Sequence, residues 1–376
     1  MHVRILESLR ELAPYRDAWA AHLAPTPFAS YAVYERWMAH QPRQTRPFVV
    51  VVLDEDGQLV ALAPWIMRTS GGLRRLSGLT DAWYQDPLFL QPARSREAAR
   101  LIVTALKRVA WRWDLLDLNV QDSLSEPLLA ELDGLGRAHV ERIDGWQTRI
   151  IRFEADWDAY WQQRSKNFRH KSKRNEARLA GVPHRWYVAD DSNLPALVAE
   201  VFDRHAARWT PTARKNWAGY YAMYRAIADQ AMARGELFLF VLEIEGQPAA
   251  FKLSIRHGDW AYWIFQIYDP AFSVYSPSNL LTMRALQHFY ELGLRQVDPG
   301  GGDDPWKESL MTESLRTLQP LIASPASLTG NALVAWKGRV RPWLKEYRWF
   351  VSTIRSLREA KHRLFSPRAV PNRISL

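Results

Sequence analysis

The chain has 376 residues, no cysteine and a formal net charge of +10, with 47% hydrophobic and 24% charged residues. This length allows two ordinary domains, and the composition is that of a globular protein. The absence of cysteine excludes disulfides, thiolate nucleophiles and cysteine-based zinc sites. Ten histidines without metal-ligand spacing lead us to expect no metal. The N-terminus lacks the apolar segment of a signal peptide, so we expect a cytoplasmic location.

The positive charge is concentrated at the C-terminus. Eleven Lys and Arg residues lie between Ser327 and Leu376, opposed there only by Glu346 and Glu359, so about +9 of the net charge belongs to this stretch. Aromatic residues recur within it at helical spacing. The pattern predicts a basic, Trp-rich helical tail over residues 326–376. It is either an interfacial helix on anionic lipid, which would make the protein membrane-peripheral, or an amphipathic helix packed on its own domain.

The first half combines helices with a hairpin. Pro14 is expected to kink or restart the first helix, and Asp56-Gly57 between two apolar runs indicates a hairpin turn. The predicted elements, in order, are strand His2–Glu7, helix Leu9–Leu23, helix Tyr31–His40, strands Phe48–Leu53 and Leu59–Met67, helix Ser95–Trp113, strand Asp114–Val120 and helix Leu124–Leu135.

The second half repeats this order of helices, strand meander and a helix that returns to a strand. Its predicted elements are strand Thr148–Glu154, one long basic helix Ala155–Ala180, strand Trp186–Ala189, helices Ser192–Trp209 and Asn216–Gly235, strands Glu236–Glu243, Gln247–Arg256 and Trp260–Tyr268, a helix to Leu292 and a strand ending at Asp298. We therefore predict a duplicated α/β fold with mixed sheets. The domains are residues 1–145 and 146–325, followed by the tail.

A helix N-terminus after the aromatic strand Trp260–Tyr268 is the first candidate site. Ser276, Ser278 and Asn279 are good capping residues, and Pro277 fits an early helical position. Three or four unpaired backbone N–H groups would point outward there, which favours binding of a phosphate or pyrophosphate. The alternative is an ordinary helix cap.

Asp298 and Lys307 flank a Gly-rich loop and form the second candidate. A carboxylate at the carboxyl end of a strand can serve as a general base, and a lysine can bind substrate or a developing oxyanion. The alternative is that Asp298 only caps the turn and that Asp303 and Asp304 belong to a solvated loop.

Two helices carry further candidates. His205, Arg208 and Trp209 share one helical face, where they are either core residues or part of a substrate pocket. Seven basic side chains crowd the stretch Lys166–Arg178, which has Glu176 as its only acid. A stretch of this kind is either a solvated face or a site for an anionic ligand.

These pieces together resemble the GNAT-type acyltransferases associated with cellulose and other exopolysaccharide biosynthesis, which are relatives of the Fem-type peptidoglycan aminoacyl transferases. The resemblance covers roughly residues 3–320. It rests on Pro27–Ser30, Asp56–Pro64, Asp81 with Asp86-Pro87, Trp113–Leu118, Ser165–Arg174, His205–Trp209, Gly246–Ala250, Tyr268–Pro270, Tyr275–Leu281 and Asp298 through Gly301 to Lys307. The family usually has Gly where Ser278 stands and Tyr where Trp306 stands.

The resemblance implies two tandem GNAT-like folds and transfer of an acyl group from acyl-CoA to an amine or hydroxyl acceptor, in polysaccharide or cell-envelope biosynthesis. It assigns the donor, the acceptor and the chemistry to three sets of residues. These are Tyr275, Ser276, Ser278, Asn279 and Leu280 with Arg169 and Lys173 for the donor; His205, Arg208, Trp209, Tyr268 and Asp304 for the substrate; and Asp298 and Lys307 for catalysis.

Two other functions stay open. An aminoacyl-tRNA-dependent transferase of the Fem type would use the basic helix Lys166–Arg178 to hold the tRNA. A CoA-dependent enzyme would use the same helix for the 3′-phosphate of CoA. An acidic glycan is a third anionic ligand that this helix would suit. A non-catalytic module that binds a membrane surface through its tail is the other alternative.

Overall fold

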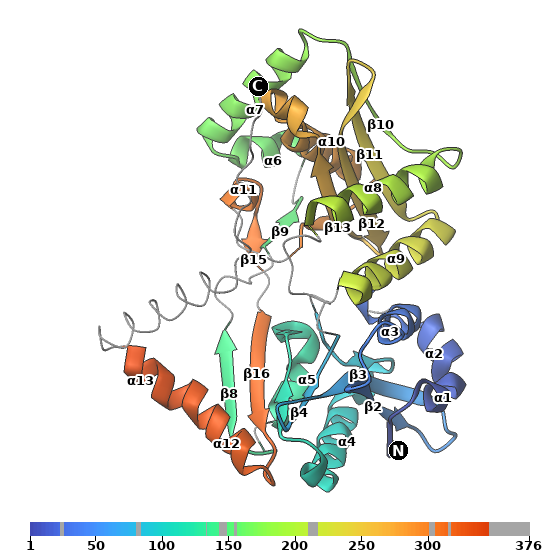
Figure 1. Cartoon of the computed structure of the whole chain (residues 1–376), viewed down its shortest axis with the longest axis vertical. Helices are drawn as coiled ribbons and strands as arrows, with labels where there is room; N and C mark the ends of the chain where they lie inside the picture. Colours follow the sequence, from blue (N-terminus) through green and yellow to red (C-terminus); the bar gives the residue numbers. More distant parts are fainter. Residues whose placement is uncertain are drawn as a thin grey trace, which may run out of the picture.

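The computed structural model describes the chain except for residues 23–25, 80–83, 133, 143–148, 154–155, 210–216, 301–304, 315–316 and 346–376. Figure 1 shows two α/β bodies, one above the other, joined through helices. Each body has its own mixed sheet, so the predicted fold class is confirmed. None of the described helices is long and apolar enough to cross a membrane.

The lower body in Figure 1 contains the first sheet, in the order β1-β2-β3-β4-β6-β16-β7, with β5 on β3 and β8 on β16. Neighbouring strands are antiparallel except β4 and β6, which are parallel. The strands are β1 His2–Leu6, β2 Thr45–Leu53, β3 Leu59–Ser70, β4 Leu73–Ser77, β5 Leu88–Phe89, β6 Leu115–Asp117, β7 Val120–Gln121, β8 Ala138–Arg142 and β16 Thr317–Ala323.

The upper body contains the second sheet, in the order β10-β11-β12-β13-β14-β9-β15. Here β13 and β14 form the parallel pair. The strands are β9 Arg149–Arg152, β10 His184–Val188, β11 Leu237–Ile244, β12 Gln247–His257, β13 Trp260–Tyr268, β14 Gln296–Asp298 and β15 Glu313–Ser314.

The helices cover both faces of each sheet. They are α1 Leu9–Leu12, α2 Arg16–Ala21, α3 Tyr31–Met38, α4 Ser95–Arg108, α5 Asp122–Leu132, α6 Trp157–Gln163, α7 Lys166–Leu179, α8 Leu194–Trp209, α9 Trp217–Ala233, α10 Pro277–Glu291, α11 Pro305–Glu308, α12 Leu328–Ala335 and α13 Arg341–Lys345. As expected from Pro14, a 3₁₀ turn at Ala13–Tyr15 separates α1 from α2.

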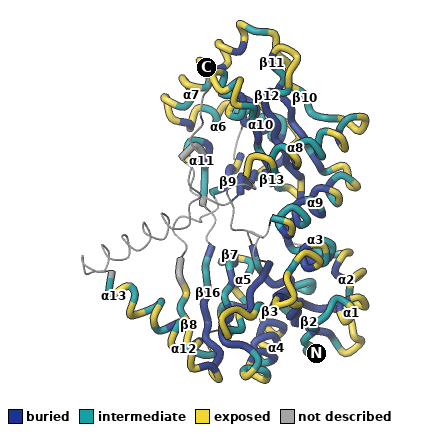
Figure 2. Tube along the Cα trace, in the orientation of Figure 1, coloured by how far each residue is buried: buried dark blue, intermediate teal, exposed yellow. Residues whose placement is uncertain are grey.

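One hydrophobic core runs through both bodies. Helices α3 and α9 pack against each other, and the buried cluster around them includes Trp37 of the first half and Met223 of the second. Figure 2 shows buried backbone on both sides of this junction. Two further cores lie beneath α4 and α5 in the first half and beneath α10 in the second.

The structure differs from the sequence prediction in two places that matter for the site. The helix predicted over residues 155–180 is wrong as one element: it is broken between α6 and α7. Arg164 has an extended backbone there, and Ser165 caps α7 by accepting a hydrogen bond from the N–H of Phe168. The buried guanidinium of Arg164 donates to the carbonyls of Tyr160 and Leu310, at 3.2 and 2.7 Å. The interruption therefore coincides with the point where this side chain enters the core.

The second difference concerns β16. Its residues 317–323 lie inside the predicted second domain, 146–325, yet they pair with β6, β7 and β8 of the first sheet. The chain thus returns to the first body before the tail begins. Within the tail the structure describes residues up to Lys345, where α12, a π-helical turn at Trp336–Val340 and α13 form a continuous helical segment. The rest of the predicted tail lies outside the described residues.

Candidate active site

The second sheet opens where β13 and β14 separate. Their register joins Trp260 to Gln296 and Tyr262 to Asp298. β14 then ends at Asp298, whereas β13 continues to Tyr268. The side chains at the end of β14 are therefore placed beside the part of β13 that has lost this neighbour. α10, which follows β13, starts near the same opening.

Asp298 is buried at this opening, with 2% of its surface exposed. One carboxylate oxygen, Oδ2, accepts a hydrogen bond from the hydroxyl of Tyr84 at 2.7 Å. The other, Oδ1, accepts from the backbone N–H of Gly300 at 2.8 Å. Burial raises the pKa of Asp298 to about 6, although these two hydrogen bonds and the charge of Lys307 act to lower it. A carboxyl group with this pKa exchanges a proton near neutrality.

Lys307 lies within the same cluster. It belongs to α11, is 5% exposed and donates from Nζ to the carbonyl oxygen of Gly300 at 3.0 Å. Gly300 has a φ of +82°, a left-handed conformation that glycine adopts without strain. Asp298 caps this turn, as the non-catalytic alternative for this residue predicted. The same turn brings the carboxylate and the ammonium together.

Tyr84 was not predicted. It belongs to the first half and is 214 residues away from Asp298 along the chain. Its ring packs edge-on to Phe28, with ring centroids 6.4 Å apart. No sequence pattern links Tyr84 to Asp298, because the contact exists only once the two halves are joined. The available sequence signal was indirect. Tyr84 lies between Asp81 and Asp86-Pro87, which belong to the stretches that carry the family resemblance.

Lys252 is a second residue that the sequence prediction missed. It lies in the middle of β12 and is wholly buried. Its Nζ donates to Gln266 Oε1 at 2.7 Å and to Thr282 Oγ1 at 3.3 Å, and it lies 3.3 Å from the centre of the Trp263 ring. Burial, together with the like charge of Lys307, holds the pKa of Lys252 well below its usual range. A lysine inside the apolar strand Ala249–Ile255 was the available signal.

The predicted phosphate site at the N-terminus of α10, called the cradle below, has fewer unpaired backbone N–H groups than expected. Ser276 precedes α10 in a left-handed conformation, with φ 52° and ψ 51°, and its side chain makes no capping hydrogen bond. Its carbonyl oxygen accepts the N–H groups of Asn279 and Leu280, at 3.0 and 3.3 Å. Pro277 has no N–H, so the expectation of three or four unpaired donors is wrong. The N–H of Ser278 remains, beside a buried Ser278 hydroxyl oxygen without a hydrogen-bond partner.

The other members of the predicted cradle have different places. Tyr275 ends the 3₁₀ turn Pro270–Tyr275, and Leu280 points into the core of the second half. Gln266 links the cradle to Lys252, because its Nε2 donates to the carbonyl oxygen of Ser278 at 3.2 Å. The first turn of α10 is thereby fixed to the strand beneath it.

A cavity of about 390 Å³ lies between α7 and the start of α10. Asn279 and Thr282 line it from α10, and Lys171 and Asn175 line it from α7. The predicted donor residues of α7 are placed differently. Arg169 donates a hydrogen bond to Gln162, Lys173 is exposed, and neither lines this cavity.

The predicted substrate residues form one cluster at the far end of β13. Arg208 lies over the ring of Tyr268 at 4.9 Å and over that of Trp209 at 5.5 Å. His205 stacks on Phe265, with ring centroids 4.1 Å apart. Burial, and to a smaller extent the charge of Arg208, lowers the pKa of His205 to about 4, so it is neutral at physiological pH. Asp304 lies outside the described residues.

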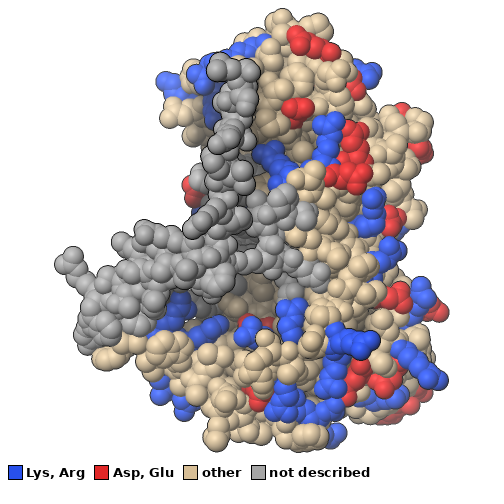
Figure 3. Space-filling model, in the orientation of Figure 1, with Lys and Arg blue, Asp and Glu red and all other residues tan. Residues whose placement is uncertain are grey.

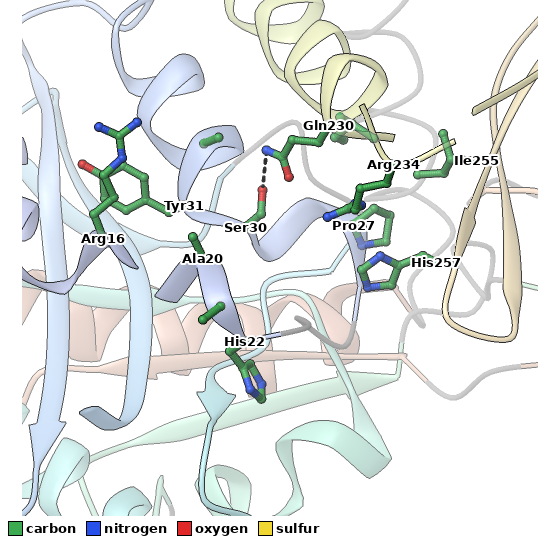
Figure 4. Close-up of a pocket in the computed structure, with 13 residues that line it drawn as sticks. Arg16, Ala20, His22, Pro27, Ser30, Tyr31, Gln230, Arg234, Ile255 and His257 are labelled. Carbon is green, nitrogen blue, oxygen red and sulfur yellow. Dashed lines mark hydrogen bonds between the residues drawn. The ribbon is translucent and has the colours of Figure 1, made fainter. Parts of the chain in front are cut away.

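A further cavity, of about 420 Å³, lies between the two halves. In Figure 4, Ser30 of the first half accepts a hydrogen bond from Gln230 of the second, at 3.2 Å. Arg16 and Arg234 stand on different sides of this cavity. None of the described residues that line this cavity is Tyr84, Asp298 or Lys307, so the cavity is separate from the candidate active site.

The comparisons with known proteins agree with this architecture. Residues 162–308 match the family model of the acetyltransferase (GNAT) domain. This range includes α7, the α10 N-terminus, Asp298 and Lys307. No curated protein matches the chain.

Solved structures resemble the chain over most of its length, at low sequence identity. The crystal structure of FemX has a TM-score of 0.53 and 12% identity, covering 85% of this chain and 97% of that one. A conserved protein of unknown function from Bacteroides thetaiotaomicron has a TM-score of 0.54 and 11% identity, covering 85% and 100%. The C-terminal domain of a putative lysylphosphatidylglycerol synthetase from Agrobacterium fabrum has a TM-score of 0.52 and 12% identity, covering 86% and 94%. These likenesses establish the fold of both halves together.

Proposed function

We propose that this protein is an acyltransferase that moves an acyl group from acyl-CoA to an amine or hydroxyl acceptor. The GNAT-domain match over residues 162–308 supports acyl transfer as the general reaction. The donor, the acceptor and the roles of single residues are our proposal, built on the geometry around Asp298.

The observation that carries the proposal is the buried carboxylate of Asp298, held by Tyr84 at the point where β13 and β14 separate. The acceptor nitrogen or oxygen attacks the thioester carbonyl carbon, and its proton passes to the carboxylate of Asp298. The C–S bond then breaks and the thiolate leaves. Lys307 lies close enough to lower the pKa of Asp298, so its ammonium would also stabilise the negative charge that develops on the carbonyl oxygen.

The donor would lie along the first turn of α10. The N–H and hydroxyl of Ser278 and the positive end of the helix dipole favour phosphate oxygens there. Lys171 and Asn279, which line the adjoining cavity, would contact the rest of the donor. The acceptor would meet the aromatic cluster of His205, Arg208, Trp209 and Tyr268. On the sequence resemblance alone, we place this acceptor in polysaccharide or cell-envelope biosynthesis.

The test compares Asp298→Asn with the control Asp229→Asn, an exposed position on α9. Thiol release from acetyl-CoA is measured with a panel of amino sugars, polyamines and amino acids, and products are identified by mass spectrometry. Loss of a general base typically slows turnover about 100-fold or more. We expect that loss for Asp298→Asn, with unchanged acetyl-CoA affinity, and no effect for Asp229→Asn. Full turnover by Asp298→Asn would refute the assigned base, and a folded protein that does not bind acetyl-CoA would refute the donor.

One observation favours a second candidate, transfer from an aminoacyl-tRNA. Lys173, Arg174 and Arg178 of α7 are exposed, and Figure 3 shows a patch of Lys and Arg side chains at the end of the molecule where α7 lies. An RNA backbone would be held there electrostatically. In that case RNase abolishes activity, the wild type releases no thiol from acetyl-CoA, and a Lys173→Ala/Arg174→Ala variant loses RNA binding while its thermal unfolding midpoint stays equal to that of the wild type.

A further inference from the structure

Two arginines stand directly opposite each other in the first sheet. Arg68 of β3 and Arg75 of β4 are paired in the antiparallel register. Their side chains therefore leave the same face of the sheet at neighbouring positions. Like charges in such a pair repel each other and destabilise the sheet. The pairing by itself therefore works against the stability of the sheet.

The neighbouring acid neutralises only one of the two charges. Arg75 Nη1 lies 3.4 Å from Oδ2 of Asp117, whose Oδ1 also accepts a hydrogen bond from Gln319 at 3.0 Å. Arg68 donates from Nε to the hydroxyl of Thr45 at 3.4 Å and forms no ion pair within the described part of the chain. The positive charge of Arg68 is therefore not balanced by an acidic side chain within the described residues.

Both arginines line a cavity of about 410 Å³. The other polar residues that line it are Ser70, Ser77, Gln85, Asp117, Asn119 and Gln319. Hydrogen bonds to the backbone hold one side chain of this wall in place. The Gln85 amide accepts hydrogen bonds from the backbone N–H groups of Gly78 and Asn119, at 3.2 and 3.1 Å, and donates to the carbonyl of Leu79 at 3.0 Å. The guanidinium groups thus border a preformed polar cavity.

We propose that this cavity is an oxyanion site, in which Arg68 and Arg75 together bind the phosphate or carboxylate group of a small ligand. Guanidinium groups match both kinds of oxyanion in bidentate geometry. A bound anion lies between the two like charges and removes their repulsion. The site belongs to the first half and does not depend on acyl transfer. Along the chain, Gln85 of its wall directly follows Tyr84, which donates a hydrogen bond to Asp298.

The test uses the full chain, with thermal unfolding and calorimetric titration at constant ionic strength. The probes are inorganic phosphate, pyrophosphate and succinate, with chloride as the reference anion. Arg68→Gln is compared with Arg100→Gln, which removes the same charge from an exposed pair with Glu131. We expect oxyanions to raise the melting temperature of the wild type and of Arg100→Gln. Arg68→Gln should melt at or above the wild type without oxyanion, and its affinity should be at least tenfold weaker.

The opposite outcomes would overturn the proposal. A site elsewhere is indicated if oxyanions stabilise Arg68→Gln as much as the wild type. A purely structural role for Arg68 is indicated if its substitution lowers the melting temperature without oxyanion and no probe stabilises the wild type beyond chloride. A preference for pyrophosphate assigns the ligand to phosphate compounds, and a preference for succinate assigns it to carboxylates; both results support the site.

Discussion

Tyr84 is the residue through which the first half reaches the candidate catalytic carboxylate. Its hydroxyl donates to Asp298 Oδ2, which favours the ionised carboxylate and lowers its pKa against the effect of burial. The hydroxyl itself need not touch substrate. Tyr84 is therefore a positioning residue, and its removal should show in the pH dependence of the reaction.

In Tyr84→Phe the pKa of Asp298 should rise further, because the carboxylate loses a donor. A base works only when deprotonated, so the acid limb of the kcat/KM profile should move to higher pH. A hydrogen bond to a charged group contributes about 1.5–3 kcal/mol, so we expect a loss of roughly tenfold at about pH 6. At about pH 8.5 the loss should be smaller, since the carboxylate is then ionised in both proteins. A profile lowered equally at every pH would contradict this role.

Lys252 makes a prediction about stability. Its pKa is lowered in the folded state, so the unfolded chain binds a proton that the folded chain releases. Stability should therefore rise from neutral pH towards about pH 10, the ordinary pKa range of lysine. Lys252→Met removes that slope. Denaturant unfolding of both proteins should show the variant gaining most relative to wild type at low pH, and parallel curves would contradict the burial of an ionisable amine.

These residues show which parts of the candidate site a sequence can reveal. Asp298 could be predicted because a carboxylate at a strand end before glycines is a local pattern. Lys307 followed from the same loop. Tyr84 could not, since 214 residues separate it from Asp298 and only the joined halves bring them together. Lys252 was visible as one charge in an apolar strand, but its partner Thr282 comes from another element.

At the scale of elements, α10 provides the donor end of the proposed site. Its first turn is fixed from below by the hydrogen bond from Gln266 to the Ser278 carbonyl. This leaves the Ser278 N–H and hydroxyl as the local donors. A carboxylate introduced there would occupy the position of a phosphate without harming the helix, because negative charge near a helix N-terminus is favourable.

We therefore expect Ser278→Glu to abolish acetyl-CoA binding in calorimetry while the midpoint of thermal unfolding stays level or rises. Gln287→Glu is the matched control, since it adds the same charge to the same helix about two and a half turns further on. Its binding should equal that of the wild type. Equal loss in both variants would indicate general repulsion of an anionic ligand, and binding retained in Ser278→Glu would exclude the first turn of α10.

Element boundaries were predicted well where they depend on local signals. Pro14 separates α1 from α2, and the turn around Gly57 joins β2 to β3, as expected. The break between α6 and α7 was missed although Ser165, which caps α7, is a local signal for a helix start. The hydrogen bond from Arg164 to the carbonyl of Leu310, which accompanies the break, is tertiary and leaves no local pattern. Helical propensity alone favours continuing through these residues.

At the scale of the whole molecule, the two halves share one core. Phe28 lies at their junction, with its ring 6.4 Å from that of Tyr84 and 6.1 Å from that of Tyr224 on α9. It is 5% exposed. Because the cluster is continuous, the halves should unfold together and a substitution at the junction should affect both.

Phe28→Ala should lower the free energy of unfolding by about 3–5 kcal/mol, the usual effect of truncating a buried aromatic side chain. Fluorescence and circular dichroism should still follow one transition, at lower denaturant. Leu328→Ala, at a position that is 89% exposed, should stay within about 0.5 kcal/mol of the wild type. Two separated transitions in the variant would show that the halves are stable independently.

The duplicated α/β order was visible in the sequence, because both halves repeat the same helix and strand pattern. The position of β16 in the first sheet was not visible in the sequence. Its mostly apolar residues 317–323 suit an edge or an inner strand of either sheet, and only pairing with β6 and β8 decides between them. Long-range strand pairing of this kind leaves no local trace.

The return of β16 has a consequence for how the protein is made. The first sheet needs residues 317–323 to join β6 to β8, yet β8 ends at residue 142. At the usual pace of translation the ribosome takes on the order of ten seconds or more to synthesise the intervening segment. During that time the nascent first half has open strand edges, which are prone to pair with other chains. The first sheet therefore closes only after its last strand has emerged from the ribosome.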